Sequence, residues 1–388
     1  MFLRQLTLQH YRNYADLDVT FDAGLVVLQG ANAQGKTNLL EAVYLLAATK
    51  SSRARSDAEL ISWRERDPLS QIDFARVVGR VERSDALTTL EIVIREGGAE
   101  GQARKRFKLN GAERRAGEVL GRINAVFFSP TDVELIAGSP SVRRRYLDVM
   151  LCQVDAGYVR ALNQYNRVIL QRNALLRQVR ERQQPPRMLE YWDDLLTEQG
   201  AQVMGGRAAA VRDLGSIAAE RHHDLSAGLE RLEVRYKPAL FEPPAPDELA
   251  DGGALVARDW LRRSLQRHRE REIAAGMSLY GPHRDDLSFA VDGVDATAFG
   301  SRGQQRTAAL ALKLAELQYM RVATGEQPIL LLDDATSELD ARRREAILAA
   351  AAEVKQTFVT SADGASLGDL AGASQRWEVA SGTLRQLR

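Results

Sequence analysis

The sequence has 388 residues, of which 45% are hydrophobic and 27% are charged, a composition typical of a soluble globular protein with two or three domains. No apolar run approaches the roughly 18 residues needed to cross a bilayer, which argues against a membrane-embedded protein and a membrane partner. The single cysteine, Cys152, excludes an internal disulfide and fits a reducing compartment, so we expect the protein in the cytoplasm. A net charge of +1 by itself neither favours nor excludes nucleic acid as a partner.

The first 48 residues predict strands followed by a helix. "MFLRQLTLQHYRNY" alternates apolar and polar residues from its second position, which is typical of a strand rather than of an export signal. "LVVL" (25–28) is a short apolar run able to form a buried strand. Apolar residues then recur at helical spacing, namely Leu39, Leu40, Val43, Leu46 and Ala47.

The segment "GANAQGKT" joins this strand to the helix and has phosphate-binding spacing, with four residues between its first glycine and Gly-Lys-Thr. In such a loop, backbone N–H groups and the helix N-terminus surround the anionic tail of a nucleotide. Lys36 can neutralise phosphate charge during catalysis, and the Thr37 hydroxyl can bind Mg²⁺. The predicted nucleotide-binding residues are Gly30, Ala31, Asn32, Ala33, Gln34, Gly35, Lys36 and Thr37. The alternative is a glycine turn that happens to precede a helix.

Residues 70–128 contain short alternating runs that predict an antiparallel β lobe, with Asn110-Gly111 as a tight hairpin turn. After residue 130 the periodicity becomes helical and continues to about residue 276, with two proline clusters that mark turns. Strand character returns in "SLYGPHRDDLSFAVDG". The predicted domains are residues 1–130 and 277–388, two parts of one nucleotide-binding body, and an inserted helical body at 131–276.

A second phosphate-binding site is predicted in "FGSRGQQRTAALALKLAEL" (299–317). Its polar start precedes an apolar-periodic helix, so a hydroxyl and a glycine N–H lie at the positive end of the helix dipole. Because the phosphate loop already encloses its own nucleotide, we expect two chains head to tail, each contacting the γ-phosphate held by its partner. The residues assigned to this contact are Ser301, Arg302, Gly303 and Gln304. The alternative is a capped helix without a ligand.

The segment "PILLLDDATSELD" (328–340) predicts a buried strand that ends in paired carboxylates. Beside a phosphate loop, such carboxylates hold Mg²⁺ and orient an attacking water. We assign Asp333 to the metal, together with Thr37, and Asp334 to the water. Asp340 follows in a tight turn where it could contact the nucleotide site of the opposite subunit. The alternative is that both acids cap a strand end.

Taken in order, these motifs resemble those of SMC-class ABC-type ATPases and, more narrowly, of the RecF family of bacterial recombination mediators. The resemblance also rests on "HYRNY" (10–14), "FSPTD" (128–132), "GSPSVRRRYLD" (138–148) and "GPHRDDL" (281–287), and it covers essentially the whole chain. It implies an α/β ABC-type P-loop ATPase head, with a mixed core sheet and an antiparallel β lobe, interrupted by an α-helical arm.

The resemblance also implies a DNA repair protein that dimerises on ATP and binds junctions of single- and double-stranded DNA. With RecO and RecR, such a protein helps to load RecA at gaps, in repair, replication restart and the SOS response. Two positions depart from the general ABC pattern. Asp334 replaces a glutamate base, and Thr360 or Ser361 stands where a switch histidine would be. We therefore expect slow hydrolysis, suited to a timer.

Residues 143–187 are basic, with ten Arg against three Asp or Glu, and they favour a DNA-binding helical arm. The predicted DNA contacts are Arg143, Arg144, Arg160, Arg167 and Arg172. The alternative is a solvated helix face. Rival functions are a DNA-stimulated ATPase whose turnover is the main output, another SMC-like ATPase head, and the motor subunit of a transporter, which the basic arm disfavours.

Overall fold

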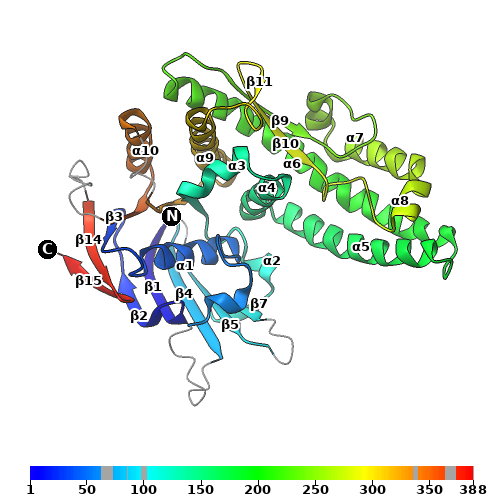
Figure 1. The fold of residues 1–388 in the computed structure, drawn as a ribbon. Coiled ribbons are helices and arrows are strands. Elements are labelled where there is room, and N and C mark those ends of the chain that lie inside the picture. Colours follow the sequence, from blue (N-terminus) through cyan, green and yellow to red (C-terminus); the bar gives the residue numbers. More distant parts are fainter. Residues whose placement is uncertain (63–72, 85, 98–102, 335–339, 363–372, 388) are drawn as a thin grey trace. The chain divides into compact units, whose positions relative to one another are not determined.

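The computed structural model describes residues 1–62, 73–84, 86–97, 103–334, 340–362 and 373–387 (Figure 1). The chain forms two compact units. Unit 1 contains residues 1–132 and 316–388, and unit 2 contains residues 133–315. Among the described helices, none is long and apolar enough to cross a membrane.

A mixed six-stranded sheet in unit 1 carries the phosphate loop. Its strand order is β15-β14-β3-β13-β12-β8, and β14, β3, β13, β12 and β8 run parallel while β15 is antiparallel to β14. The strands are β3 (Gly24–Gln29), β8 (Ala125–Phe128), β12 (Ile329–Leu332), β13 (Gln356–Ser361), β14 (Ala373–Ala380) and β15 (Thr383–Leu387). This topology brings the ends of β3, β12 and β13 together, although they are far apart in the sequence.

The second sheet of unit 1 is antiparallel, in the order β2-β1-β4-β5-β6-β7. Its strands are β1 (Phe2–Tyr11), β2 (Tyr14–Thr20), β4 (Phe74–Glu82), β5 (Leu87–Arg95), β6 (Arg104–Leu109) and β7 (Ala112–Arg114). Asn110 and Gly111 both have positive φ angles, 49° and 82°, so the predicted hairpin turn is confirmed.

Helix α1 (Lys36–Ala48) shares a hydrophobic core with both sheets, and this core includes Leu8, Val26, Leu40 and Ile92. The remaining helical elements of unit 1 are η1 (Asp57–Leu60), α2 (Ala116–Val119), η2 (Pro130–Val133, whose last residue belongs to unit 2) and α10 (Ala341–Glu353). The helix predicted from the apolar periodicity of residues 39–47 is confirmed. Its periodic apolar residues are all buried in this core, namely Leu39, Leu40, Val43, Leu46 and Ala47.

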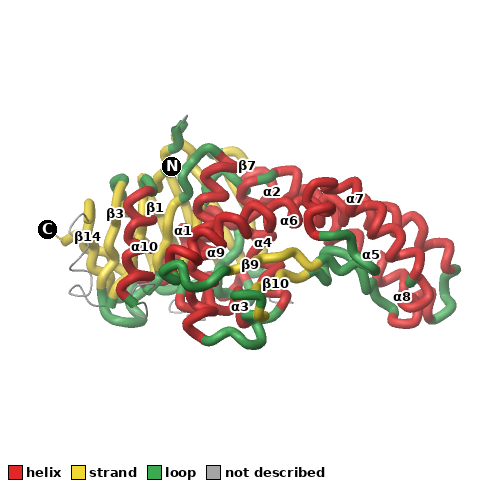
Figure 2. The backbone as a smooth tube through the Cα atoms, turned by 90° about the horizontal axis from the view of Figure 1, so that it is seen from above, coloured by secondary structure: helices red, strands yellow, loops and turns green. Residues whose placement is uncertain are grey.

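Unit 2 is mainly helical, and its long helices α5 and α6 lie side by side in both views (Figure 2). Its elements are α3 (Glu134–Ala137), α4 (Pro140–Val154), α5 (Ala156–Arg180), η3 (Pro186–Met188), α6 (Leu189–Leu225), β9 (Leu232–Lys237), α7 (Pro246–Arg267), α8 (Arg269–Ala275), β10 (Asp286–Val291), β11 (Val294–Asp295) and the first part of α9 (Arg302–Thr324).

The boundaries of unit 2 differ from the predicted helical body, which ends at residue 276. Strand β9 lies within the segment predicted to be helical, and β10 pairs with it antiparallel from Asp286↔Lys237 to Val291↔Leu232. This pairing ties residues 286–291 to the helices, so unit 2 continues to residue 315. The start of unit 2 at residue 133 lies close to the predicted start at residue 131.

Candidate functional site

The phosphate loop runs from the end of β3 to the start of α1 and turns through unusual backbone angles. Gly30, Ala33 and Gly35 have φ angles of 154°, 64° and 117°. A Cβ atom on Gly30 would lie 2.3 Å from the carbonyl oxygen of Val379, so only glycine fits there. The Lys36 ammonium donates to the carbonyl oxygens of Gly30 and Ala31, the latter at 2.9 Å, and therefore lies inside the curve of the loop.

The loop borders a cavity of about 240 Å³ whose lining comes from four distant parts of unit 1. The lining residues are Asn32, Ala33, Gly35, Lys36, Thr37, Asn38, Arg53, Asp333, Asp334, Thr360, Ser361 and Ala362. The structure therefore brings together the predicted phosphate loop and both predicted carboxylates, which are separated by most of the chain.

A hydroxyl and a carboxylate meet in this cavity. The Thr37 hydroxyl donates to Oδ1 of Asp333 at 2.8 Å, and the Thr360 hydroxyl donates to the same oxygen at 3.0 Å. Mg²⁺ prefers oxygen ligands and is usually held by one or two carboxylates together with substrate phosphates. The Thr37–Asp333 pair fits that requirement. Among the described residues no cluster of three or more His, Cys, Asp or Glu forms a metal site, and a phosphate-bound Mg²⁺ does not need one.

Asp334 follows Asp333 directly after the end of β12, and its backbone has a φ of 49°. Its N–H donates to the Thr360 hydroxyl at 2.8 Å, so Thr360 contacts both acidic residues. Burial lowers the pKa of Lys36, and the nearby Asp334 and Asp333 carboxylates oppose this shift. The ammonium and the two carboxylates are therefore close enough to influence one another, as the predicted catalytic pair requires.

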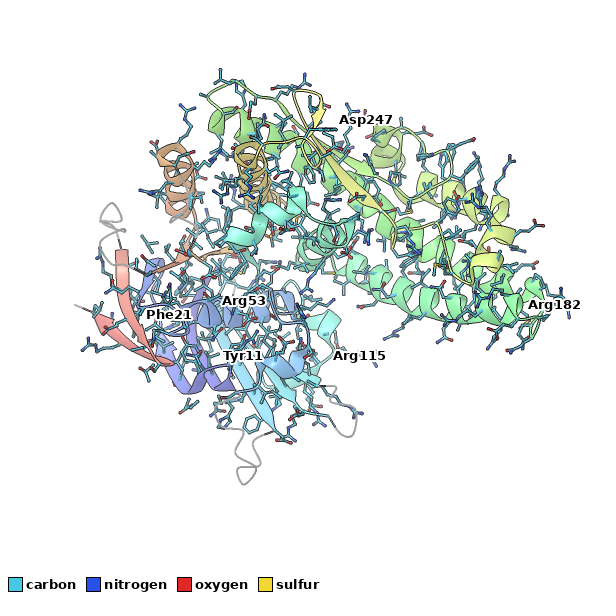
Figure 3. The ribbon with its side chains drawn as sticks, in the orientation of Figure 1. Tyr11, Phe21, Arg53, Arg115, Arg182 and Asp247 are labelled. Atoms are coloured by element: carbon cyan, nitrogen blue, oxygen red, sulfur yellow. The ribbon has the colours of Figure 1, made fainter. Side chains whose placement is uncertain are left out.

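Arg53 also lines the cavity and is labelled in Figure 3. It donates to Oδ1 of Asn38 at 2.8 Å and reaches the Glu41 carboxylate at 3.5 Å. Glu41 is fully buried and also accepts two hydrogen bonds from Arg12 and one from Ser51. Burial alone would raise the pKa of Glu41, but the Arg12 and Ser51 hydrogen bonds outweigh it and hold the pKa below its usual value.

The sequence analysis did not assign Arg53 to this site and also missed Asn38 and Glu41. The available signal was their helical position, because Asn38 and Glu41 follow Thr37 within the first turn and a half of α1. Side chains at this end of a helix can reach a ligand at its N-terminus. A buried glutamate in an otherwise apolar stretch also requires a partner.

The second predicted anion site lies in unit 2, at the start of α9. Ser301 and Gln304 form a reciprocal capping box. The Gln304 N–H donates to the Ser301 hydroxyl at 3.2 Å, and the Ser301 N–H donates to the Gln304 side chain at 3.0 Å. Ser301, Arg302 and Gly303 are exposed.

Asp340 caps a different helix. Its carboxylate accepts the Arg343 N–H at 3.0 Å at the start of α10 and forms an ion pair with the Arg343 side chain at 2.9 Å. The three residues before it in the predicted turn, 337–339, lie outside the described residues. The assignment of Asp340 to the opposite nucleotide site stays a prediction.

Two of the predicted DNA contacts are contradicted by the structure. Arg143 is 4% exposed and binds both carboxylate oxygens of Asp286, at 2.6 and 2.9 Å. Arg172 is 0% exposed and donates to Asp193, Glu272 and Ser278 at 2.6 to 2.7 Å. Both guanidinium groups are committed to internal carboxylates and cannot reach a DNA backbone without breaking the packing of unit 2.

The other predicted arginines differ in exposure. Arg144 is half-buried and donates to the backbone oxygen of Asp285 at 2.7 Å. Arg160 and Arg167 are exposed on α5, two helical turns apart, and therefore lie on one face. Helix α5 contains no Asp or Glu, so no acidic side chain of its own lies on that face.

The "GPHRDDL" segment is an internal anchor of unit 2. Asp285 is buried and accepts hydrogen bonds from the Tyr236 hydroxyl, from the Ala239 N–H at 2.7 Å and from Arg207 at 3.2 Å. Arg207 also donates to the Pro282 carbonyl oxygen at 2.6 Å. The segment thus joins α6 and β9 through one buried charge network, a role that the sequence alone did not suggest.

Comparison with known proteins identifies the relatives of this chain. A family model described as RecF/RecN/SMC N terminal domain matches residues 2–373. A DNA replication and repair protein RecF from Limosilactobacillus fermentum is 43% identical over 363 residues, which cover 93% of this chain and 92% of that protein. Its counterpart from Roseiflexus castenholzii is 40% identical over 396 residues, with 99% of each chain covered.

Solved structures extend the comparison to the fold. A structure of the recombination mediator protein RecF with ATP in the RecFOR pathway covers 100% of this chain and 98% of its own, at 31% identity and a TM-score of 0.88. An Smc head bound to the C-winged helix domain of ScpA matches with a TM-score of 0.55 at 14% identity, which shows a shared fold. The predicted ABC-type ATPase fold is confirmed.

Proposed function

This chain belongs to the RecF/RecN/SMC family and, within it, to the DNA replication and repair proteins named RecF, and we propose that it is an ATP-switched, DNA-binding recombination mediator. In this proposal ATP drives homodimer formation, and the dimer binds junctions of single- and double-stranded DNA at gaps. With RecO and RecR it promotes RecA loading in the cytoplasm, in repair, replication restart and the SOS response. The RecF structures with ATP in the RecFOR pathway support the cofactor and the pathway.

The observation that carries the proposal is the cavity that gathers Lys36, Thr37, Asp333 and Asp334. Its geometry suits a magnesium nucleotide, because an ammonium faces the curve of the loop and a hydroxyl–carboxylate pair lies beside it. Lys36 would neutralise phosphate charge, and Thr37 and Asp333 would hold Mg²⁺. Asp334 would orient water for a slow hydrolysis that ends the bound state.

The start of α9 supports dimerisation on ATP. Ser301 and Gly303 are exposed at the positive end of a long helix, where N–H groups favour an anion. In a head-to-tail dimer this end would bind the γ-phosphate held by the partner, and ADP would offer it nothing to bind. The nucleotide would therefore be the switch between monomer and dimer.

A charge change at Ser301 tests this contact without loss of the helix cap. Asp, Asn and Ser are equally good N-cap residues. Ser301→Asp should fold and bind ATP but stay monomeric in ATP, because its carboxylate repels the γ-phosphate. Ser301→Asn, which keeps the cap and adds no charge, should still dimerise. Sedimentation in ADP, ATP and a non-hydrolysable analogue measures the outcome, and a Ser301→Asp variant that dimerises like the wild type would exclude the contact across the interface.

The exposed face of α5 is the proposed DNA contact. Arg160, Arg167 and Arg177 are exposed there, and within the described part of the chain no acidic side chain forms an ion pair with them. Sequence-independent binding of DNA depends on such phosphate contacts, and each one contributes about one unit to the slope of log affinity against log salt.

A pair of triple variants tests this face. Replacing Arg160, Arg167 and Arg177 by Gln should weaken the binding of gapped DNA and reduce the salt slope by about three units. The control replaces Arg212, Arg258 and Arg262 by Gln. These are exposed on α6 and α7 of the same unit, but each forms an ion pair with an aspartate. It makes the same change in net charge and should leave the slope nearly unchanged. Equal slopes for the two triple variants would refute a specific role of α5.

A further inference from the structure

The turn between β1 and β2 contacts the outer side of the phosphate loop. The Asn13 side-chain N–H donates to the carbonyl oxygen of Gln34 at 2.9 Å, and the buried Tyr14 hydroxyl donates to the carbonyl oxygen of Gly35 at 2.9 Å. The Gly35 carbonyl also accepts the Leu39 N–H at 3.0 Å, the first hydrogen bond of α1. Two successive carbonyl groups of the loop are thus held by side chains of one hairpin turn.

A second turn, between β14 and β15, holds the same part of the loop. The Gly382 N–H donates to the Gln34 carbonyl oxygen at 3.1 Å, and the Ser381 N–H donates to the Gln34 side chain at 2.7 Å. Gly382 has a φ of 80°, and a Cβ there would lie 2.2 Å from the backbone oxygen of Asn13. The two turns are therefore packed against each other around Gln34.

The orientation of these carbonyls determines the direction of the N–H groups in the cavity. A peptide unit is planar and trans, so its N–H points opposite to its carbonyl. With the Gln34 and Gly35 carbonyls directed at the two turns, the N–H groups of Gly35 and Lys36 point away from the turns. Gly35 and Lys36 both line the cavity. Their N–H groups are therefore aimed at the position of an anionic ligand.

We propose that Asn13 and Tyr14 are positioning residues for nucleotide binding, which orient the Gly35 and Lys36 N–H groups toward the phosphates before the ligand arrives. The inference rests on the nucleotide binding proposed above and assigns a role to the "HYRNY" segment. Pre-organised donors need not be reoriented when the ligand binds, so the affinity for phosphate is higher than in a loop whose peptide units can rotate.

A purely structural role for the hairpin would have different consequences. In that case, removal of either hydrogen bond would lower the stability of unit 1 but would leave the bound nucleotide unchanged. The experiment must therefore separate folding from the environment of the phosphates. The phosphorus NMR shift of the β-phosphate of bound ADP makes this distinction, because it responds to the hydrogen bonds that this phosphate accepts.

The variants are Tyr14→Phe, Asn13→Ala and the two combined, each in the full chain with Mg²⁺ and ADP. The matched control is Tyr165→Phe, which removes a buried tyrosine hydroxyl in unit 2 that bonds to His283 at 2.6 Å. We expect each single variant to weaken ADP binding about fivefold and the double variant about 25-fold. The β-phosphate resonance should move in these variants and stay in place in Tyr165→Phe.

Two outcomes would overturn the inference in distinguishable ways. If wild-type protein binds ADP while Tyr14→Phe and Asn13→Ala bind it within twofold of wild type with an unmoved β-phosphate resonance, the hairpin does not position the loop. If wild-type protein itself does not bind ADP or ATP, the proposed nucleotide function fails, and the role of the hairpin fails with it. If Asn13→Ala or the double variant folds poorly, Tyr14→Phe alone provides the test, because it removes a single buried atom.

Discussion

Replacement of Arg172 by Met should destabilise unit 2 strongly, although the arginine lies in a basic helix. Its three donor groups satisfy Asp193, Ser278 and Glu272, and the Arg172 and Glu272 side chains are both 0% exposed. Methionine has a similar length but no charge, so Glu272 would keep only the Leu279 N–H as a described partner. Breaking a buried ion pair in this way costs about 3–5 kcal/mol.

The magnitude can be checked locally, because a chain of two units need not unfold in one step. Hydrogen exchange of α5 amides, followed by mass spectrometry, measures the free energy of opening in unit 2. A loss of about 3 kcal/mol corresponds to a fall of roughly 100-fold in protection. The matched control is Arg167→Met on the exposed face of the same helix, for which we expect a change of about 0.5 kcal/mol or less.

A double-variant cycle separates the ion pair from the lost packing. Arg172→Met combined with Glu272→Gln should lose less stability than the two single changes added together, by about 1–3 kcal/mol, because the neutral amide no longer requires a cation. A fall in α5 protection of less than fivefold, or an equal fall in Arg167→Met, would refute the reasoning. In that case the ion pairs of Arg172 would contribute little to the stability of unit 2.

Changes at four other positions probe the nucleotide site and the pH dependence of unit 2. Lys36→Arg should weaken ATP binding by about tenfold or more in calorimetry, because a planar guanidinium does not fit where the compact ammonium contacts the Gly30 and Ala31 carbonyls; normal affinity would remove Lys36 from the site. Asp334→Asn should prolong the lifetime of the ATP-bound dimer in sedimentation, and an unchanged lifetime and hydrolysis rate would move the catalytic carboxylate elsewhere. Thr360→Val removes the hydroxyl that contacts Asp333 and the Asp334 N–H, so ATP hydrolysis should fall about tenfold with less change in ADP affinity; Thr360→Ser should restore the rate if the hydroxyl is responsible. Burial lowers the pKa of His283 from 6.5 to about 4, so the unfolded chain binds this proton at a higher pH than the native state. The stability that the neutral ring contributes above pH 6.5 should therefore be lost as the pH falls toward 4, by up to about 3 kcal/mol; His283→Gln should flatten this slope in pH-dependent unfolding, and an unaltered slope would assign it to another group.

Features that depend on a short local pattern could be predicted from the amino-acid sequence alone. Such patterns span about ten residues or fewer. They predict the phosphate loop, the hairpin at Asn110-Gly111 and the buried strand before Asp333. A turn with positive φ angles requires glycine, and a strand with one buried face requires alternating apolar residues. The order of the motifs along the chain indicates the family resemblance. It also predicts that segments far apart in the sequence form one nucleotide site.

Strand β9 differs from the helix predicted for its segment, although its local pattern is that of a strand. Leu232, Val234 and Tyr236 alternate with charged residues, which is the pattern of a strand, whereas the helical texture on either side predicts a helix. Its pairing with β10 also extends unit 2 beyond the predicted boundary. Strand pairing joins residues that are far apart in sequence, and no local pattern reveals it.

The exposure of each arginine, and with it the possibility of a DNA contact, depends on how the chain folds. Arg172 follows Val168 and Ile169 by four and three residues, which places it on the apolar face of α5, whereas Arg167 lies on the opposite face. A count of charges treats the two alike. Burial of Arg172 is favourable because Asp193 and Glu272, 21 and 100 residues away, supply carboxylates at its donor groups. The energy of a buried charge depends on partners that the fold brings together, and for this reason the sequence did not reveal it.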